Sequence, residues 1–184
     1  MDSPTADRNR DVTSTPAWAS NLKAFMPLSP VSETLVRVNY SETDQMGVVY
    51  HARYLVWLDV ARTEHLRRSG MSYRDLEASG LRLAVSEVAL RYRQPARYDD
   101  LVRIRCWVRD LASRRVDFGY ALEHAGEGRL LATAFTSLLP LDQEMRLTRL
   151  PDRVRAALEA VPDPVPLRMT EIRQLTTETQ RDAD

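Results

Sequence analysis

The amino-acid sequence predicts an α+β fold in which one long helix lies against an antiparallel sheet. A single long stretch with helical periodicity, at residues 52–68, precedes four stretches with the alternation of strands, between residues 82 and 140. Short, hairpin-length turns join these four stretches, which favours antiparallel pairing between them. The helix can bury its apolar side only against the sheet, so the two are expected to share one core.

The length of 184 residues suits one domain with a sizeable core. Residues 1–30 are rich in Ser, Thr, Asp and Pro without an apolar period, which predicts a flexible N-terminal tail. The domain itself is expected at residues 31–165, and residues 166–184 are expected to form a polar C-terminal tail. Inside the domain, a short strand at 34–39 is followed by a loop at 41–49.

The long helix is predicted from apolar residues that recur at a spacing of three or four. These are Tyr54, Trp57, Leu58, Ala61 and His65. The charged residues are expected on the other sides of the helix, namely Arg53, Asp59, Arg62, Glu64 and Arg67. Gly70 is expected to end this helix, and Ser72 to begin a short second one that ends near Gly80.

The strands that follow are predicted at residues 82–94, 101–110, 115–124 and 129–140. The third has the clearest alternation, with Val116, Phe118, Tyr120 and Leu122 on one face. Pro151 is expected to begin a closing helix that continues to about residue 161, because proline is favoured at the first helical position.

The composition excludes several classes of protein. The 26 basic and 26 acidic residues balance, so no global field attracts nucleic acid or an acidic membrane. No apolar run is long enough for a transmembrane helix, and the N-terminus lacks the apolar core of a secretory signal. The single cysteine, Cys106, lies in a strand-like stretch and is expected to be a reduced core thiol. A cytoplasmic location is therefore expected.

Residues 40–57 hold the greatest concentration of potential chemistry. An acid, Asp44, and a histidine, His51, come directly before the long helix. The unpaired backbone N–H groups of a helix N-terminus can stabilise an oxyanion, and a nearby carboxylate could act on the same substrate atom. The three histidines lack the spacing of a metal site, and the sequence has neither a phosphate-binding loop nor the G-x-S-x-G motif of α/β-hydrolases. No metal and no cofactor are therefore expected.

The pattern Y-x-x-x-D-x-M-G-x-V-Y-H-x-x-Y-L-x-W, at residues 40–57, resembles the signature of the 4-hydroxybenzoyl-CoA-type acyl-CoA thioesterases of the hotdog fold. The resemblance continues through Ala61-Arg62-Thr63 and the strands to about Leu141. It implies a long central helix wrapped by a curved antiparallel sheet. It also implies an acyl-CoA substrate and a homodimer or homotetramer with active sites at the dimer interface.

The resemblance assigns three catalytic candidates. Asp44 would act as general base on water, or as a nucleophile that forms a mixed anhydride; an Asx-type turn is the structural alternative. The backbone N–H of His51 would polarise the thioester carbonyl, with or without a role for its imidazole. Tyr40 would orient Asp44 or water, or would simply close the strand. Glu64 is a weaker candidate acid, since pairing with Arg68 on the helix surface explains it.

Four further residues are candidates for substrate or CoA binding. Tyr50 and Trp57 are expected to line the acyl pocket. Arg114 and Arg115 occupy the turn where similar enzymes hold the phosphates of CoA, although a charged, solvated turn is the simpler interpretation. The alternatives to an acyl-CoA thioesterase are release of an acyl or polyketide chain from an acyl carrier protein and a non-catalytic acyl-thioester-binding module.

One residue departs from the pattern of the family. Similar enzymes commonly carry asparagine two residues after the histidine, where this chain has Arg53. That asparagine usually helps to fix the start of the helix. The local geometry of the loop is therefore the part of the resemblance that this substitution puts in doubt.

Overall fold

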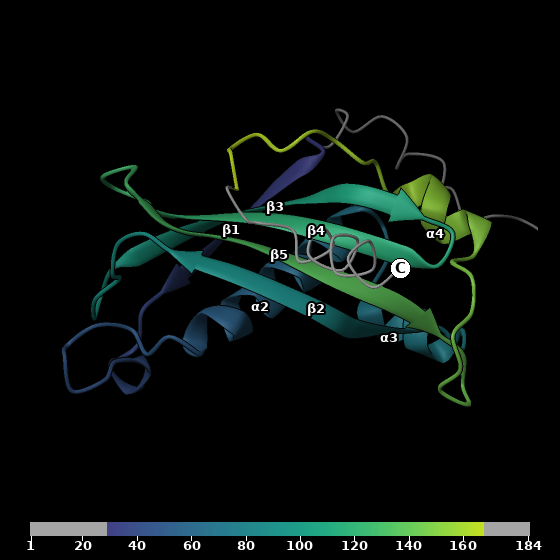
Figure 1. The fold of residues 1–184 in the computed structure, drawn as a ribbon, viewed down its shortest axis with the longest axis horizontal. Coiled ribbons are helices and arrows are strands. Elements are labelled where there is room, and N and C mark those ends of the chain that lie inside the picture. Colours follow the sequence, from purple (N-terminus) through teal and green to yellow (C-terminus); the bar gives the residue numbers. More distant parts are fainter. Residues whose placement is uncertain (1–28, 168–184) are drawn as a thin grey trace, which may run out of the picture.

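The computed structural model describes residues 29–167, which form a curved five-stranded antiparallel sheet with a long helix on one face (Figure 1). The sheet order is β1-β3-β4-β5-β2, and the strands are β1 (Val31–Arg37), β2 (Arg82–Tyr92), β3 (Leu101–Ala112), β4 (Arg115–His124) and β5 (Leu130–Leu141). The helices are η2 (Tyr40–Glu42), α2 (Arg53–Arg68), α3 (Tyr73–Ala78) and α4 (Asp152–Ala157). The predicted α+β fold is confirmed. Most of the predicted tails, 1–30 and 166–184, lies outside the described residues.

The pairing of β2 differs from the prediction. β3 with β4 and β4 with β5 form the expected hairpins, but β2 pairs with β5 and lies at one edge of the sheet. Residues 93–100 therefore do not form a hairpin turn. They cross the end of the sheet to reach β3, which lies next to β1 at the other side. We call residues 93–100 the crossing segment.

Helix α2 presents its predicted apolar side to the sheet. Tyr54, Trp57, Leu58, Ala61 and His65 are all at most 5% exposed. The prediction for Arg62 is wrong, because this residue is only 6% exposed and pairs with Asp59 one turn earlier. An arginine can bury its aliphatic stem along an apolar surface and still reach an acid with its charged end.

The ends of α2 and α3 follow the sequence signals. Gly70 has a φ of 79°, and Met71 N donates a hydrogen bond to Leu66 O at 3.0 Å, as expected where glycine ends a helix. The Ser72 side chain accepts a hydrogen bond from Asp75 N at 3.1 Å and so caps α3.

β1 begins and ends earlier than predicted. Helix α4 is shorter than predicted, because Leu158 is already extended and the residues before Pro162 and Pro164 disfavour helix.

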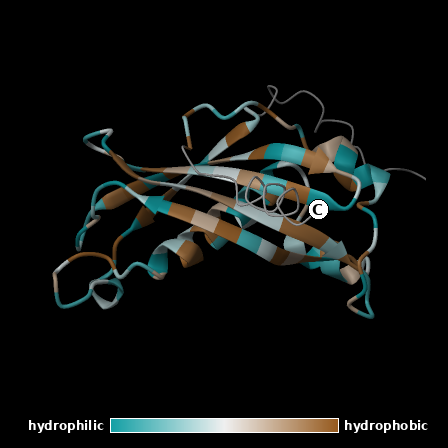
Figure 2. Cartoon of the chain, viewed as in Figure 1, coloured by the Kyte–Doolittle hydropathy of each residue, from teal (hydrophilic) through white to brown (hydrophobic). Residues whose placement is uncertain are grey.

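The two faces of the sheet are covered differently. The main core lies between α2 and the sheet, with Trp57, Phe118 and Tyr120 among its largest buried side chains. On the other face, residues 158–167 run over a second apolar cluster that contains Trp107, Ala121, Phe135 and Leu167. Both faces of β4 are therefore buried, whereas short hydrophobic and hydrophilic stretches follow one another along the largely exposed edge strand β2 (Figure 2).

Gly119 allows Trp107 to lie flat against β4. A Cβ atom at Gly119 would come within 2.4 Å of Trp107 Cε2, so only glycine fits beneath this ring. The Trp107 indole N–H donates to Asp163 Oδ1 at 2.9 Å, and Arg109 binds the same carboxylate through two nitrogens. These bonds hold residues 158–167 on the sheet.

Cys106 is fully buried in the main core, as predicted, and burial raises the pKa of its thiol. No helix among residues 29–167 is long and apolar enough to cross a membrane.

His65 is a buried histidine whose protonation links stability to pH. It is 5% exposed, and its Nδ1 lies 3.0 Å from Ser32 Oγ, which in turn donates to Cys106 O. Burial lowers the pKa of this imidazole, and the nearby Arg68 lowers it further, so the folded protein holds His65 neutral.

We expect the free energy of unfolding to fall as the pH drops from about 7 towards 5. In the unfolded chain the His65 imidazole is protonated with an ordinary pKa of about 6.5, whereas its lowered pKa keeps it neutral in the folded chain over this range. Above about pH 7 both states hold a neutral imidazole and this contribution is complete. Urea unfolding at several pH values should give a smaller decrease for His65→Gln than for the unsubstituted protein. Parallel decreases in both proteins would contradict this assignment.

Candidate active site

Asp44 begins a tight turn between η2 and α2. Its Oδ1 accepts a hydrogen bond from Met46 N at 2.9 Å, and its carbonyl oxygen accepts one from Gly47 N at 2.9 Å. Gly47 has a φ of 70°, which glycine adopts without strain. The expected Asx-type turn is therefore present. Within residues 29–167 no group donates a hydrogen bond to Asp44 Oδ2, so one carboxylate oxygen remains available.

Three backbone contacts hold the loop that carries Asp44. Tyr50 N donates to Glu42 O at 2.8 Å, Val49 N donates to Ala96 O at 2.9 Å, and Thr43 forms an antiparallel bridge with Val49. The first and last of these contacts close the loop on itself. The second ties it to the crossing segment, which lies far away in the sequence.

His51 precedes the first turn of α2. No side chain caps this helix, and no residue in the described part of the chain accepts a hydrogen bond from the backbone N–H of His51. Its carbonyl oxygen accepts a hydrogen bond from Tyr92 Oη at 2.8 Å, which fixes the peptide on the carbonyl side of this residue. Its imidazole is exposed and lies 4.2 Å from the Tyr50 ring, centroid to centroid. The N–H is therefore available to an incoming acceptor.

Asp44 and His51 line one cavity of about 290 Å³. It lies between the Asp44 loop and the residues that follow the end of β2. Its other lining residues are mostly apolar or aromatic: Met46, Val48, Val49, Tyr54, Tyr92, Arg93, Gln94 and Pro95. Asp44 and His51 therefore line the same cavity as several apolar side chains, and a site for a polarised carbonyl on an apolar group needs such a combination.

The other predicted site residues lie outside this cavity. Tyr40 is 79% exposed, and its ring packs edge-on against Tyr98 with centroids 5.6 Å apart. Tyr50 is half exposed and contacts His51 without lining the cavity. Trp57 is buried in the core, where its ring packs against Tyr54. The structure does not bring these three side chains together with Asp44.

Arg114 and Arg115 lie at the opposite end of the sheet from Asp44. Their turn joins the end of β3 to the start of β4, whereas the cavity lies near the crossing segment that leads into β3 (Figure 1). Twelve residues of β3 separate the two regions, roughly 40 Å at about 3.3 Å per residue. Arg115 is engaged by Asp110 and by Asp117, at 3.2 Å from Nε to Oδ2. Within one chain these arginines therefore cannot contact a ligand at Asp44.

Glu64 is also remote from the cavity, and its ion-pair partner is Arg67 rather than the expected Arg68. A spacing of three residues places both side chains on the same side of the helix, as a spacing of four does.

Glu42 is the residue whose role the sequence did not reveal. It is only 4% exposed, yet its carboxylate accepts hydrogen bonds from three places. Asn39 N donates at 2.8 Å, Trp57 Nε1 at 3.0 Å and Arg53 Nη2 at 3.1 Å. Burial alone would raise the pKa of Glu42, but these donors outweigh burial and hold the pKa below its ordinary value. The spacing of Asn39 and Glu42, which is that of a capping box, was the available signal.

Arg53, the first residue of α2, forms an ion pair with this carboxylate. Its guanidinium binds Glu42 Oε1, so the residue that departs from the family pattern ties the helix start to the loop. The loop geometry that the substitution put in doubt is thus supported by an ion pair with a buried acid.

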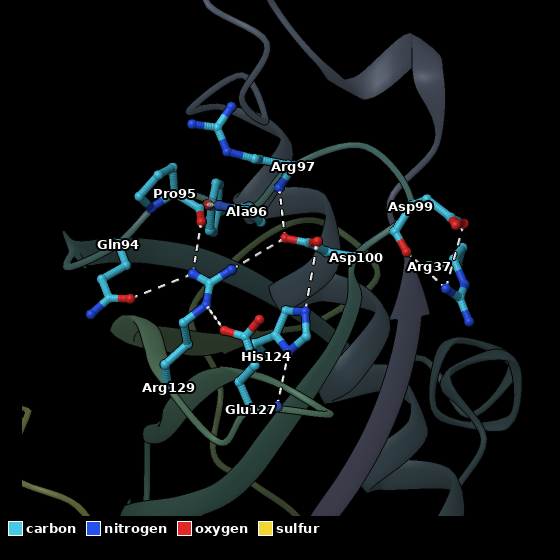
Figure 3. Close-up of polar contacts among 11 residues, drawn as sticks. Arg37, Gln94, Pro95, Ala96, Arg97, Asp99, Asp100, His124, Glu127 and Arg129 are labelled. Carbon is cyan, nitrogen blue, oxygen red and sulfur yellow. Dashed lines mark hydrogen bonds and ion pairs between the residues drawn. The ribbon is translucent and has the colours of Figure 1, made fainter.

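The crossing segment is held in place by a polar network around Asp100 (Figure 3). Asp100 accepts a hydrogen bond from Arg97 N at 2.8 Å and forms an ion pair with Arg129 at 3.5 Å. His124 Nε2 lies 3.6 Å from Asp100 Oδ1. Arg129 also donates to Pro95 O at 3.1 Å. The β4–β5 turn therefore fixes the wall of the cavity that faces Asp44.

Within residues 29–167 no group of three or more His, Cys, Asp or Glu side chains lies close enough together to hold a metal ion.

Known proteins resemble this chain over the same region. The family model of the thioesterase-like superfamily matches residues 38–158. The putative acyl-CoA thioesterase YneP of Bacillus subtilis is 35% identical over 114 residues, which cover 62% of this chain and 82% of that protein. The acyl-CoA thioester hydrolase YbgC of Escherichia coli O157:H7 is 34% identical over 122 residues, which cover 66% and 90%. The crystal structure of the hypothetical protein TT1821 from Thermus thermophilus is 42% identical, with a TM-score of 0.66 over 69% of this chain and 96% of that one.

We expect Glu42→Ala to lower the free energy of unfolding by about 2–4 kcal/mol, because it leaves Asn39 N–H and the Trp57 indole N–H without an acceptor. In a thermal melt this corresponds to a decrease in Tm of roughly 5–15 °C. Glu64→Ala is the matched control, since it removes a half-exposed helix carboxylate and should leave Tm nearly unchanged. Equal shifts in the two variants would show that Glu42 has no special role.

Proposed function

Because the chain belongs to the thioesterase-like superfamily, we propose that it hydrolyses an acyl-CoA thioester to a carboxylic acid and CoA. The names of the YneP and YbgC relatives support CoA as the carrier of the acyl group. The five-stranded antiparallel sheet with α2 on one face is the hotdog fold. The observation that supports the mechanism is the cavity that Asp44 and His51 line together.

Asp44 acts on the water that attacks the thioester. Its Oδ1 is held by Met46 N, and Oδ2 takes a proton from water as the water oxygen bonds to the acyl carbon. The backbone N–H of His51 donates to the carbonyl oxygen, on which negative charge develops. The tetrahedral intermediate then breaks its carbon–sulfur bond, and the proton held by Asp44 passes to the leaving thiolate.

A covalent route uses the same geometry. Asp44 itself attacks the acyl carbon, the CoA thiolate leaves, and water then cleaves the resulting mixed anhydride to regenerate the carboxylate. The His51 N–H stabilises the oxyanion in both routes. Both therefore require the Asp44 carboxylate.

The functional unit is a dimer joined through β2. This strand is an unpaired edge of the sheet, and Val85 and Val88 on it are 48% and 41% exposed. On α2, Leu55 and Val56 are 44% and 46% exposed. An open strand edge beside exposed apolar side chains favours pairing with a second copy. The single-chain cavity at the end of β2 would then lie close to this interface.

We expect Asp44→Asn and Asp44→Ala to lower kcat by about 10²-fold or more, because neither side chain can accept a proton from water. Release of thiol from a panel of short, long and aromatic acyl-CoA esters measures the effect. Asp152→Asn is the matched control, since it removes an exposed carboxylate on α4 and should keep full activity.

Full activity in both Asp44 variants, with an intact fold by circular dichroism, would overturn this mechanism. Cleavage of an acyl carrier protein ester without cleavage of any CoA ester would assign the reaction to a carrier protein instead. Binding of acyl-CoA without turnover would make the domain a binding module.

We expect Val88→Asp to convert a dimer into a monomer, because it places a charge on the apolar edge strand without removing a core side chain. Analytical ultracentrifugation at micromolar concentration measures the change. Leu147→Asp is the control, since it alters an exposed apolar residue outside the sheet and should leave the dimer intact. A monomeric parent protein at high concentration would contradict the dimer.

A further inference from the structure

We propose that Arg93 and Arg97 bind the phosphate of the phosphopantetheine arm that carries the acyl group. This inference rests on the proposed thioester hydrolysis, and it names the part of the substrate that the mouth of the cavity recognises. Both arginines belong to the crossing segment, and the structure, unlike the sequence pattern, places this segment beside Asp44.

The two arginines lie near the turn that carries Asp44. Arg93 is exposed and lines the same cavity as Asp44 and His51. Arg97 does not line the cavity, but its Nη1 lies 3.4 Å from the carbonyl oxygen of Gly47 in the turn. A ligand that fills this cavity therefore lies beside Arg93, and Arg97 lies against the turn that carries Asp44.

The charges of both arginines remain uncompensated. No acid among residues 29–167 forms an ion pair with either guanidinium, although two aspartates belong to the same segment. Asp99 pairs with Arg37, whose Nη1 lies 2.7 Å from the carbonyl oxygen of Asp99 and 3.4 Å from its carboxylate. Asp100 is taken by Arg129 and His124.

Figure 3 makes the arrangement at Arg97 visible. Its backbone N–H donates to Asp100, while its guanidinium points away from the network around that carboxylate. The network therefore fixes the backbone of Arg97 and leaves its charged end for another anion. A guanidinium without an acidic partner suits a phosphate, whose oxygens accept hydrogen bonds from its fork of N–H groups.

The phosphopantetheine phosphate is common to CoA and to acyl carrier proteins, so one contact serves either source. The apolar walls at Val48, Val49 and Tyr92 suit the acyl group and the uncharged arm, and the arginines suit the charged end. Arg115 offers less, because Asp110 and Asp117 already neutralise it at the far end of the sheet.

The experiment uses one acyl group on three carriers: pantetheine, 4′-phosphopantetheine and CoA. The first two differ only in the phosphate. We expect Arg93→Met/Arg97→Met to lower kcat/KM about tenfold or more for the two phosphorylated carriers and to leave the pantetheine ester within about twofold. Arg93→Lys/Arg97→Lys should recover part of the loss, because it keeps the charge without the fork. Arg74→Met, an exposed arginine of α3, is the charge-matched control and should leave all three esters unchanged.

A second readout does not depend on turnover. Calorimetry with unreactive thioether analogues of the three substrates should give a weaker Kd in the double variant for the two phosphorylated analogues alone. If Asp44→Asn retains full turnover while the calorimetric difference persists, the proposed mechanism fails and the phosphate contact stands.

Three results would overturn the phosphate contact. One is an equal loss on all three carriers, which would indicate a structural role for the arginines. Another is a loss on CoA alone, which would place the contact at the nucleotide end of CoA. The third is a loss in Arg114→Met with none in the double variant, which would return the phosphate to the β3–β4 turn. An equal loss with acyl carrier protein as with 4′-phosphopantetheine would support the contact for both sources.

Discussion

The buried carboxylate of Glu42 is the interaction on which the geometry of the site depends. It joins the N-cap of η2 at Asn39 to two places on α2, the helix start at Arg53 and the buried side at Trp57. A buried acid without donors would be costly, so these three donors stabilise the carboxylate in its buried position. Asp44, two residues later, is positioned by an acid that takes no part in the chemistry.

The second constraint comes from the path of the chain between β2 and β3. If these strands formed a hairpin, residues 93–100 would be a short turn at the sheet edge. Because β2 pairs with β5, they cross the end of the sheet and supply the acceptor for Val49 N and a wall of the cavity. The hydrogen bond from Val49 N to Ala96 O joins the loop that carries Asp44 to the crossing segment. The crossing segment is also held by Asp100, which binds Arg97 N and Arg129.

The sequence predicted the elements well because each has a local cause. The periodicity of α2, Gly70, the Ser72 cap and the alternation of the strands all act within a few residues. It also placed Asp44 and His51 together, since both belong to one short loop. The pairing of β2 with β5 could not be predicted, because that choice depends on how the whole sheet closes over α2. The burial of Arg62 and the remoteness of Arg114 from Asp44 follow from the same non-local arrangement.

The charge distribution illustrates why composition and local structure lead to different conclusions. The equal numbers of basic and acidic residues predict no global attraction for polyanions. Near the cavity, however, the acidic side chains form ion pairs within the domain: Glu42 with Arg53, Asp99 with Arg37, and Asp100 with Arg129. Of the arginines without an acidic partner, Arg93 lines a cavity whose walls are largely apolar, and Arg97 contacts Gly47 in the turn that carries Asp44. A neutral protein can therefore present a local positive charge to a substrate with one anionic end, and that end orients the uncharged thioester towards Asp44.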